Sequence, residues 1–359
     1  MAISVKASWR TNAACKIYSG YPNTYCDLQT FLLLRSLCAT PVFLFPCKRG
    51  FFCYYERMTI GIPKAFLYWK SPGYWETFFE SLGCKVVVSP PSDKNIVELG
   101  VQAADPETCF ANKIYWGHVK WLEGKCDKIF APRLKTNEAG QEYCPKFFAI
   151  PDLARIVTKT PLLTASFDSR KEAFIMTLQR LGREVGVSKK DVLAAKTKCD
   201  DGCAGIEKKN RENFWRKMDS DKQKILLISH PYNLYDEYCN LQVEKKLNQL
   251  DGEAIFLDEA ASLGSGGEFA SKGVPSLHWE FGQEMLKMVP SVLARYRFDA
   301  GIEISSFQCG CDAVIKGYVE DVFRARKTPF LYLIIDEQTG EAGYQTRLEA
   351  FCDTINARA

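Results

Sequence analysis

The stretch AGIEISSFQCGCDAVIKGYVEDVFRARKTPFLYLIID, residues 300–336, predicts a strand, a helix and a second strand in succession. Residues 300–305 form a short apolar strand, residues 313–326 read as a helix, and residues 330–336 form a strongly apolar strand. A helix that crosses between two buried strands places them in parallel, so the stretch indicates an α/β fold. Ligands gather at the carboxyl ends of parallel strands, and here the first strand leads into the motif Gln308-Cys309-Gly310-Cys311-Asp312.

Strands and helices alternate in the same way before this stretch, which predicts two α/β units with parallel sheets. The further strands that we expect are residues 59–62, 85–89, 128–131, 162–165, 224–229 and 254–257. The further helices are residues 74–82, 106–123, 169–182 with Asp168 as its cap, 237–250, 275–292 and 342–355. We therefore divide the chain into a first α/β domain at 58–187, a charged helical connector at 188–222 and a second α/β domain at 223–359.

Residues 1–57 differ in composition from the rest of the chain. They hold five cysteines and carry seven Lys and Arg against two Asp and Glu. Their apolar patch at residues 31–45 is interrupted by Arg35 and Pro41, and it is shorter than the roughly 20 residues that a membrane span needs. Its late position is untypical of a secretory signal. We expect an atypical N-terminal extension without a packed partner or membrane role; the alternative is that Met58 is the true start and that residues 1–57 are not part of the native protein.

The composition of the remaining residues excludes several classes of function. They carry 40 basic and 41 acidic side chains, which leaves no basic surface for nucleic acid. The chain has 15 cysteines at irregular spacing, an odd count that argues against a secreted disulfide framework and for a reducing, cytoplasmic location. The sequence contains no G-x-x-x-x-G-K-[ST] phosphate loop, so we do not expect the chain itself to hydrolyse ATP.

Three cysteine motifs lie far apart in the sequence, each at a predicted loop or helix start, and they centre on Cys109, Cys144 and Cys309. The positive end of a helix dipole holds a thiolate ionised, and a thiolate is the ligand that a soft metal requires. Three such residues that converge in space would suit an iron–sulfur cluster with one open iron. Cys311 is a candidate fourth ligand, and Asp312 is a candidate cap of the next helix. The alternative is that these cysteines pack as small apolar residues.

Two further segments carry candidate catalytic side chains. His230 follows a predicted strand in a polar, aromatic loop, where an imidazole acts as a general acid or base or is simply a capped loop residue. Glu341 is one of the carboxylates that follow the last strand, where a site of an α/β sheet should lie. Alternatively, Thr339 or Gly340 in that segment only starts the final helix.

Seven segments of the chain carry a resemblance to a known family. They are IGIPKA (60–65), ETCF (107–110), GHV (117–119), CP (144–145), HPYNLYD (230–236), FQCG (307–310) and IDEQTGEAGYQTRLEAF (335–351). With them, the chain from Met58 to about Ile355 resembles the 2-hydroxyglutaryl-CoA dehydratase D-component-like proteins. It is similar in particular to the group labelled CoA-substrate-specific enzyme activase-related. The last segment is the most specific match.

The resemblance implies two Rossmann-like domains with a [4Fe-4S] cluster in the cleft between them, bound by Cys109, Cys144 and Cys309. It implies an anaerobic, oxygen-sensitive lyase that removes water from a 2-hydroxyacyl-CoA by radical chemistry. A separate ATP-dependent activase of the sugar-kinase/Hsp70 fold would supply the one electron needed. Cys311 stands where relatives commonly have proline, so ligation by a fourth cysteine, which would close the open iron, stays an alternative. A dimer or a hetero-oligomer is compatible with the sequence.

Three alternatives to a dehydratase stay open at this point. The first is a non-catalytic subunit that bears a cluster and acts as an electron relay or assembly factor beside the activase. The second is a reductase with a larger, fused cluster. The third is a cluster-free α/β protein that uses its cysteines only for packing.

Overall fold

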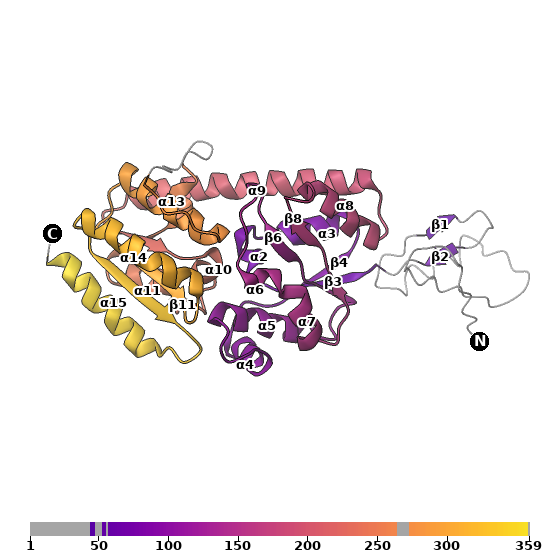
Figure 1. Ribbon diagram of the computed structural model, residues 1–359, viewed down its shortest axis with the longest axis horizontal. Coiled ribbons are helices and arrows are strands. Elements are labelled where there is room, and N and C mark those ends of the chain that lie inside the picture. Colours follow the sequence, from indigo (N-terminus) through magenta and orange to yellow (C-terminus); the bar gives the residue numbers. More distant parts are fainter. Residues whose placement is uncertain (1–43, 47–51, 55–56, 264–272, 358–359) are drawn as a thin grey trace, which may run out of the picture.

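The computed structural model describes residues 44–46, 52–54, 57–263 and 273–357. The predicted extension at 1–57 therefore lies almost wholly outside the described residues. Within it, β1 (Leu44–Pro46) and β2 (Phe52–Tyr54) pair in antiparallel register. From residue 57 onward the chain forms two α/β lobes and one long helix that runs along both of them (Figure 1).

The first lobe is built on a four-stranded parallel sheet with the strand order β4-β3-β5-β7. Its strands are β3 (Thr59–Ile62), β4 (Lys85–Val88), β5 (Lys128–Phe130) and β7 (Leu162–Leu163), and a second parallel pair is formed by β6 (Arg133–Thr136) and β8 (Ser166–Asp168). Its helices are α2 (Leu67–Lys70), α3 (Tyr74–Ser81), α4 (Lys94–Ala103), α5 (Phe110–Leu122), α6 (Pro145–Phe148), α7 (Ile150–Val157) and α8 (Phe174–Glu184). The inner strands β3 and β5 are largely buried between these helices, as parallel strands require, whereas the edge strand β4 is only partly buried.

The second lobe has a four-stranded parallel sheet with the order β10-β9-β11-β12. Its strands are β9 (Gln223–Ile228), β10 (Gly252–Phe256), β11 (Ala300–Ser306) and β12 (Phe330–Ile335). Its helices are α10 (Pro231–Leu234), α11 (Val243–Gln249), α12 (Leu257–Ala261), α13 (Glu280–Arg295), α14 (Gly310–Ala325) and α15 (Glu341–Asn356). Every residue of β11 is buried, because helices cover both faces of this central strand. The predicted α/β class with two parallel sheets is confirmed.

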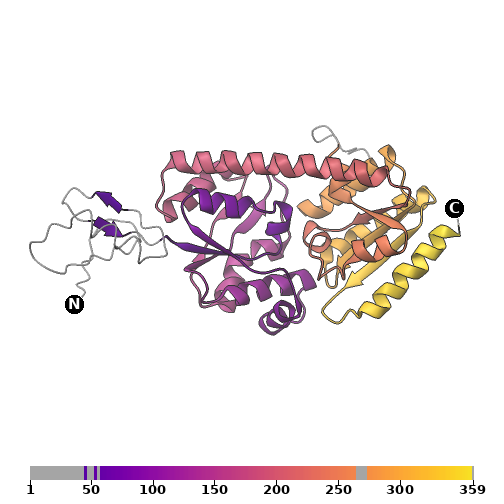
Figure 2. The same ribbon diagram turned by 180° about the vertical axis from the view of Figure 1, so that it is seen from behind.

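Helix α9 (Lys189–Met218) joins the lobes and follows both of them, as Figures 1 and 2 show. Its 30 residues span about 45 Å at the rise of an α-helix. A capping box between Ser188 and Asp191 fixes its start. Near that end the thiol of Cys199 contacts the carbonyl of Tyr74 in the first lobe, and near the other end Lys217 is buried and ion-paired in the second lobe. The helix therefore holds the lobes at a set separation.

Four helices begin later than the sequence predicts, two of them for an evident local reason. Asp168 is the last residue of β8 and accepts a hydrogen bond from Thr136, so it does not cap a helix, and α8 begins at Phe174. The helix expected from 237 begins at 243, because Leu241 and Gln242 have positive φ angles of 54° and 57° that a right-handed helix does not allow. The helices expected from 106 and from 275 begin at 110 and at 280.

Helices α4 and α5 cross in backbone contact, which positions the start of α5. A Cβ atom added to Gly100 would collide with the carbonyl oxygen of Lys113, and one added to Gly117 would collide with the carbonyl oxygen of Ile96. Neither carbonyl can move without breaking its own helix. Both glycines are therefore required by close approach rather than by backbone conformation.

We predict that Gly100→Ala lowers the free energy of unfolding by about 1–3 kcal/mol, because overpacking against backbone outweighs the gain in helix propensity. The matched control is Gly205→Ala in the exposed middle of α9, where no described atom lies within 4 Å of the added Cβ. That change should raise the free energy of unfolding by up to about 1 kcal/mol. Urea unfolding of wild type, Gly100→Ala and Gly205→Ala measures both changes in the free energy of unfolding. Equal midpoints for the two variants would contradict the packing argument.

Candidate functional site

The three cysteines that the sequence singles out each immediately precede a helix. Cys109 is the N-cap residue of α5, Cys144 that of α6 and Cys309 that of α14. These residues are separated by up to 200 positions in the chain, yet all three line one cavity between the lobes. Its volume is about 510 Å³, open mouth included. Cys311, the second residue of α14, lines the same cavity.

Local backbone geometry turns the cysteines toward the cavity. Pro145 follows Cys144 at the first position of α6, where its missing N–H costs no hydrogen bond. Gln308 adopts a positive φ of 63° just before Cys309, which is uncommon for a residue with a side chain. Its side-chain amide faces residues 106–108 of the other lobe. The strained residue thus joins the β11–α14 turn to the segment that leads into Cys109.

Burial dominates the electrostatics of these thiols. Burial raises the pKa of Cys109 and of Cys144 above the ordinary value, and it raises the pKa of Cys309 to about 12. The backbone N–H groups of Asn112 and Lys146 act to lower the pKa of Cys109 and Cys144, but their effect is smaller. The expectation that helix starts alone hold these thiols ionised is therefore wrong. Taking the sulfur out of water costs more than the helix start stabilises.

His230 lies at the wall of the same cavity and is 2% exposed. Its Nε2 atom is 2.8 Å from Oδ1 of Asp312 and 4.0 Å from Sγ of Cys309. Burial by itself lowers the pKa of His230, but the adjacent Asp312 carboxylate and the thiols of Cys309 and Cys311 together raise it well above its ordinary value. His230 is the N-cap residue of α10 and lies two residues after the end of β9. It therefore places a positive charge beside the sulfurs.

Asp312 does not cap α14, because Cys309 occupies that position and Asp312 is the third helical residue. Its carboxylate is instead buried against His230. The Nδ1 atom of His230 has no hydrogen-bond partner within the described part of the chain. This imidazole is thus held on one side only, which leaves one ring nitrogen without a structural role.

Aromatic side chains form most of the remaining wall and exclude water. They are Phe66, Phe147, Tyr232, Trp279 and Phe281, and Lys146 is the one lysine among the lining residues. The Tyr232 ring stacks on His230 with the ring centroids 5.0 Å apart. Sequence reasoning missed this wall. The only available signal was the polar, aromatic character of the loop after β9.

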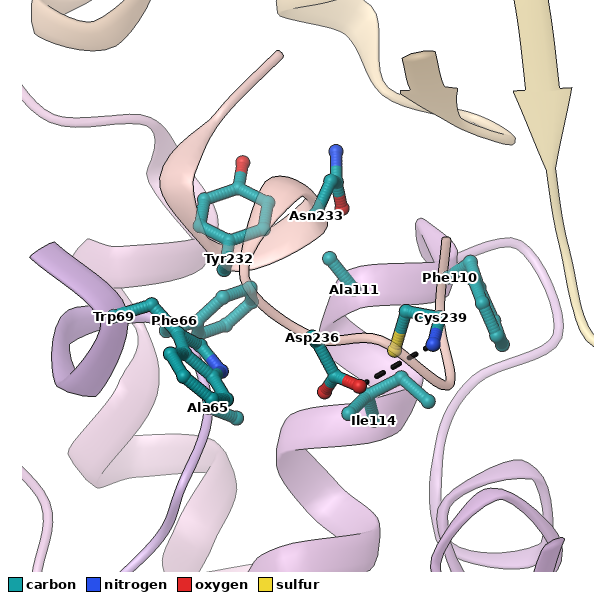
Figure 3. Close-up of a pocket in the computed structure, with 10 residues that line it drawn as sticks. All are labelled: Ala65, Phe66, Trp69, Phe110, Ala111, Ile114, Tyr232, Asn233, Asp236 and Cys239. Atoms are coloured by element: carbon teal, nitrogen blue, oxygen red, sulfur yellow. Dashed lines mark hydrogen bonds between the residues drawn. The ribbon is translucent and has the colours of Figure 1, made fainter. Parts of the chain in front are cut away.

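A second, smaller cavity of about 230 Å³ lies behind Phe66 and Tyr232, which belong to both walls (Figure 3). Asp236 faces it and accepts a hydrogen bond from the backbone N–H of Cys239. The same carboxylate accepts a hydrogen bond from Ser92 of the first lobe, whose hydroxyl lies 3.0 Å from Nε2 of His118. The Asp236 carboxylate in this cavity is therefore occupied in joining the lobes.

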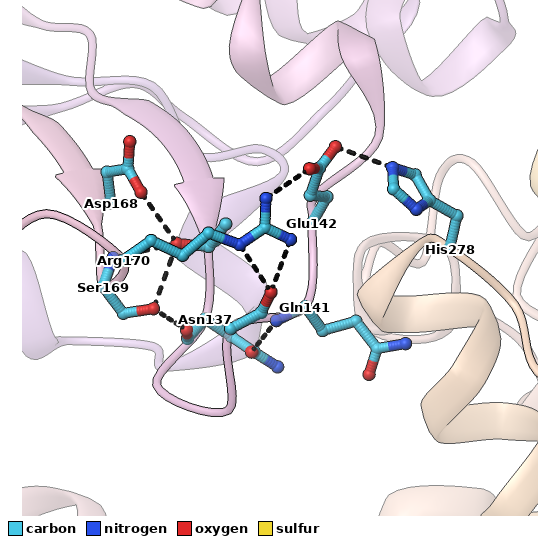
Figure 4. A network of polar contacts seen from close by, with 9 residues as sticks. Asn137, Gln141, Glu142, Asp168, Ser169, Arg170 and His278 are labelled. Carbon is cyan, nitrogen blue, oxygen red and sulfur yellow. Dashed lines mark hydrogen bonds and ion pairs between the residues drawn. The ribbon is translucent and has the colours of Figure 1, made fainter.

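A polar network holds the segment before Cys144 in place (Figure 4). The Glu142 carboxylate pairs with Arg170 at 2.6 Å and with His278 at 2.7 Å. The backbone N–H of Glu280 donates to the carbonyl of Glu142 at 2.7 Å. His278 and Glu280 lie beside the start of α13 in the second lobe, so the network is a bridge between lobes.

Glu341 lies away from the cavity. It is the first residue of α15, its side chain is 74% exposed, and it pairs with Lys246 at 2.6 Å. Gly340 is the N-cap residue there, which agrees with the simpler interpretation of that segment. Of the residues singled out in the sequence, the structure thus brings together Cys109, Cys144, Cys309, Cys311 and His230, and leaves Glu341 apart.

The solved structures that this chain is similar to share little of its sequence. The similar structures include FpvC from P. aeruginosa in complex with Ni²⁺, at 13% identity over 84% of this chain and 97% of that chain. ZnuA is 11% identical and a Zn(II)-bound AdcAII variant of Streptococcus pneumoniae is 10% identical, each over 84% of this chain and 98% of its own. All three have a TM-score of 0.23, which carries no conclusion about this chain. No curated protein matches.

A family model gives the informative match. Residues 59–259, more than half of the chain, match the model described as the CoA enzyme activase uncharacterised domain. The matched span contains Cys109, Cys144 and His230. Within the described residues, no helix has both the length and the apolar character needed to cross a bilayer. Because the family model matches more than half of its residues, the chain belongs to the family of the CoA enzyme activase uncharacterised domain.

Proposed function

We propose that this protein is the iron–sulfur component of a 2-hydroxyacyl-CoA dehydratase system, activated by one electron from a partner ATPase. One observation carries the proposal. Cys109, Cys144 and Cys309 come from three separate segments and line a single cavity between the lobes. Packing alone does not call for thiols of three distant segments on one cavity wall, whereas a cluster does. The membership of the activase family supports the link to CoA chemistry.

The residues present fit an iron–sulfur cluster. The ten cysteines between residues 84 and 352 are free, so the thiols of the cavity are available as ligands. Burial raises the pKa of Cys109, Cys144 and Cys309, so these three thiols carry protons at neutral pH, and a bound iron ion would displace these protons outright. A Cβ at Gly310 would meet no described atom within 4 Å, so the turn between Cys309 and Cys311 is open toward a bulky group.

Within such a site the chain's own groups have distinct tasks. A bound cluster would supply one-electron chemistry, while the protein orients the substrate and excludes water. The charge of His230, fixed by Asp312, would stabilise thiolates at Cys309. The aromatic wall keeps the cavity apolar, and Lys146 adds a positive charge beside Cys109 and Cys144.

Two forms of this function differ in where the electron goes. In the first, the chain binds a 2-hydroxyacyl-CoA and removes water from it by radical chemistry, as a lyase. In the second, the chain only relays the electron to another subunit. The second form is favoured by one observation, the buried Cys311 thiol on the same wall. A fourth thiolate would occupy the position that a substrate oxygen requires.

We predict that anaerobically reconstituted protein holds about four irons with matching sulfide per chain. Cys109→Ala, Cys144→Ala and Cys309→Ala should each lose the brown chromophore and most of the iron, because each removes a thiolate. Iron and acid-labile sulfide analysis with visible absorption measures the loss.

Cys84→Ala and Cys352→Ala are the matched controls, since both thiols are buried but lie outside the cavity. They should keep full iron. Full iron in all three cavity variants would refute the ligand assignment.

We predict that a broad panel of acyl-CoA thioesters distinguishes enzyme from relay. If the reduced protein is itself the dehydratase, a 2-hydroxyacyl-CoA should change the electron spin resonance signal of the cluster, because substrate oxygen approaches iron. CoA without an acyl group is the control. A signal unchanged across the panel would exclude the first form and leave the relay.

A further inference from the structure

We infer that Cys311 is a fourth protein thiolate of the cavity, so that the bound cluster has no iron open to substrate. The inference rests on the proposed function and decides between its two forms. A [4Fe-4S] cluster with three cysteine ligands leaves one iron for an exogenous molecule, whereas four cysteines fill all four positions. The number of thiolates therefore determines what the site can do.

The position of Cys311 in α14 gives it access to the cavity. Cys309 is the N-cap residue of this helix and Cys311 its second residue, and both line the cavity. His230 lies close to both of them in space. Its Nε2 atom is 4.0 Å from Sγ of Cys309, and a ring nitrogen, Sγ of Cys311 and a carboxylate oxygen of Asp312 lie within 4.8 Å of one another. Both thiols therefore flank the same imidazole.

Cys311 also shares a cavity wall with the two thiols contributed by the first lobe. Cys109 and Cys144 line the same cavity as Cys309 and Cys311. The four thiols therefore belong to one site rather than to two separate pairs. Thiols gathered in one site are costly as thiolates unless a cation lies among them.

The neighbouring helix α13 leaves room for this thiol. A Cβ at Gly282 would lie 2.6 Å from Sγ of Cys311, so any residue with a side chain would displace the sulfur. Cys311 is 5% exposed, and its sulfur lies against Gly282 of α13. The sulfur is therefore held at the cavity wall, as a ligand must be. A thiol that only filled space would not have to share this wall with three others.

The test uses the full chain, reconstituted anaerobically with iron and sulfide. Wild type, Cys311→Ser, Cys311→Ala and the control Cys352→Ala are reduced, and their spin resonance spectra are recorded with and without cyanide, which binds an open iron. We expect cyanide to leave the wild-type and Cys352→Ala spectra unchanged. In both Cys311 variants it should shift the spectrum, and mild oxidation should release one iron per cluster while the sulfide remains.

The outcomes separate the inference from the proposed function. A cyanide response in wild type, or Cys311 variants that keep their iron and ignore cyanide, would overturn the inference and leave the three-cysteine cluster standing. Wild type that binds no iron, or iron without sulfide, would overturn both. If a Cys311 variant fails to fold by circular dichroism, the cyanide response of wild type still decides the question by itself.

Discussion

One contact between the lobes makes the site possible. The backbone N–H of Phe110 donates to the carbonyl of Phe307 at 3.2 Å, one residue from Cys109 and two residues from Cys309. Close by, Lys113 of α5 forms a largely buried ion pair with Glu337, which follows β12, at 2.6 Å. Because breaking a buried pair leaves an uncompensated charge, this contact resists separation of the lobes. Helix α9 limits the remaining freedom, so thiols from distant segments stay opposite one another.

The buried ionisable groups beside the cavity are typical of a functional site rather than of a stable core. Glu303 on β11 is buried, and neither of its carboxylate oxygens has a hydrogen-bond partner among the described residues. Burial, with the nearby Asp312, raises its pKa to about 8. A stable core would hold an apolar side chain on this central strand, since an unpartnered buried carboxyl group is costly. Perturbed groups gathered beside a cavity are typical of functional sites.

Local signals in the sequence identified most strands and the cysteine positions, because apolar runs and helix starts depend on neighbouring residues. The strand–helix–strand unit at 300–336 forms as predicted except that its helix begins at Gly310 rather than at 313, which places its cysteines at the helix start. The aromatic wall and the Glu142 network were not predictable, because they depend on how two separate lobes meet. The prediction that these thiols are ionised was wrong for the same reason. Burial is a property of the assembled fold, and at Cys309 it exceeds the local helix effect.

The family match ends at residue 259, so two of the four thiols lie beyond it. The strand order β10-β9-β11-β12 explains how they reach the site. Strands β9 and β11 are hydrogen-bonded neighbours with Glu303 beside Ile228, so their carboxyl ends lie together, and His230 follows one while Cys309 follows the other. The matched part alone provides the chemistry of two thiols and one imidazole. The ligand number, and with it the choice between an enzyme that binds substrate and an electron relay, depends on the turn from β11 to α14.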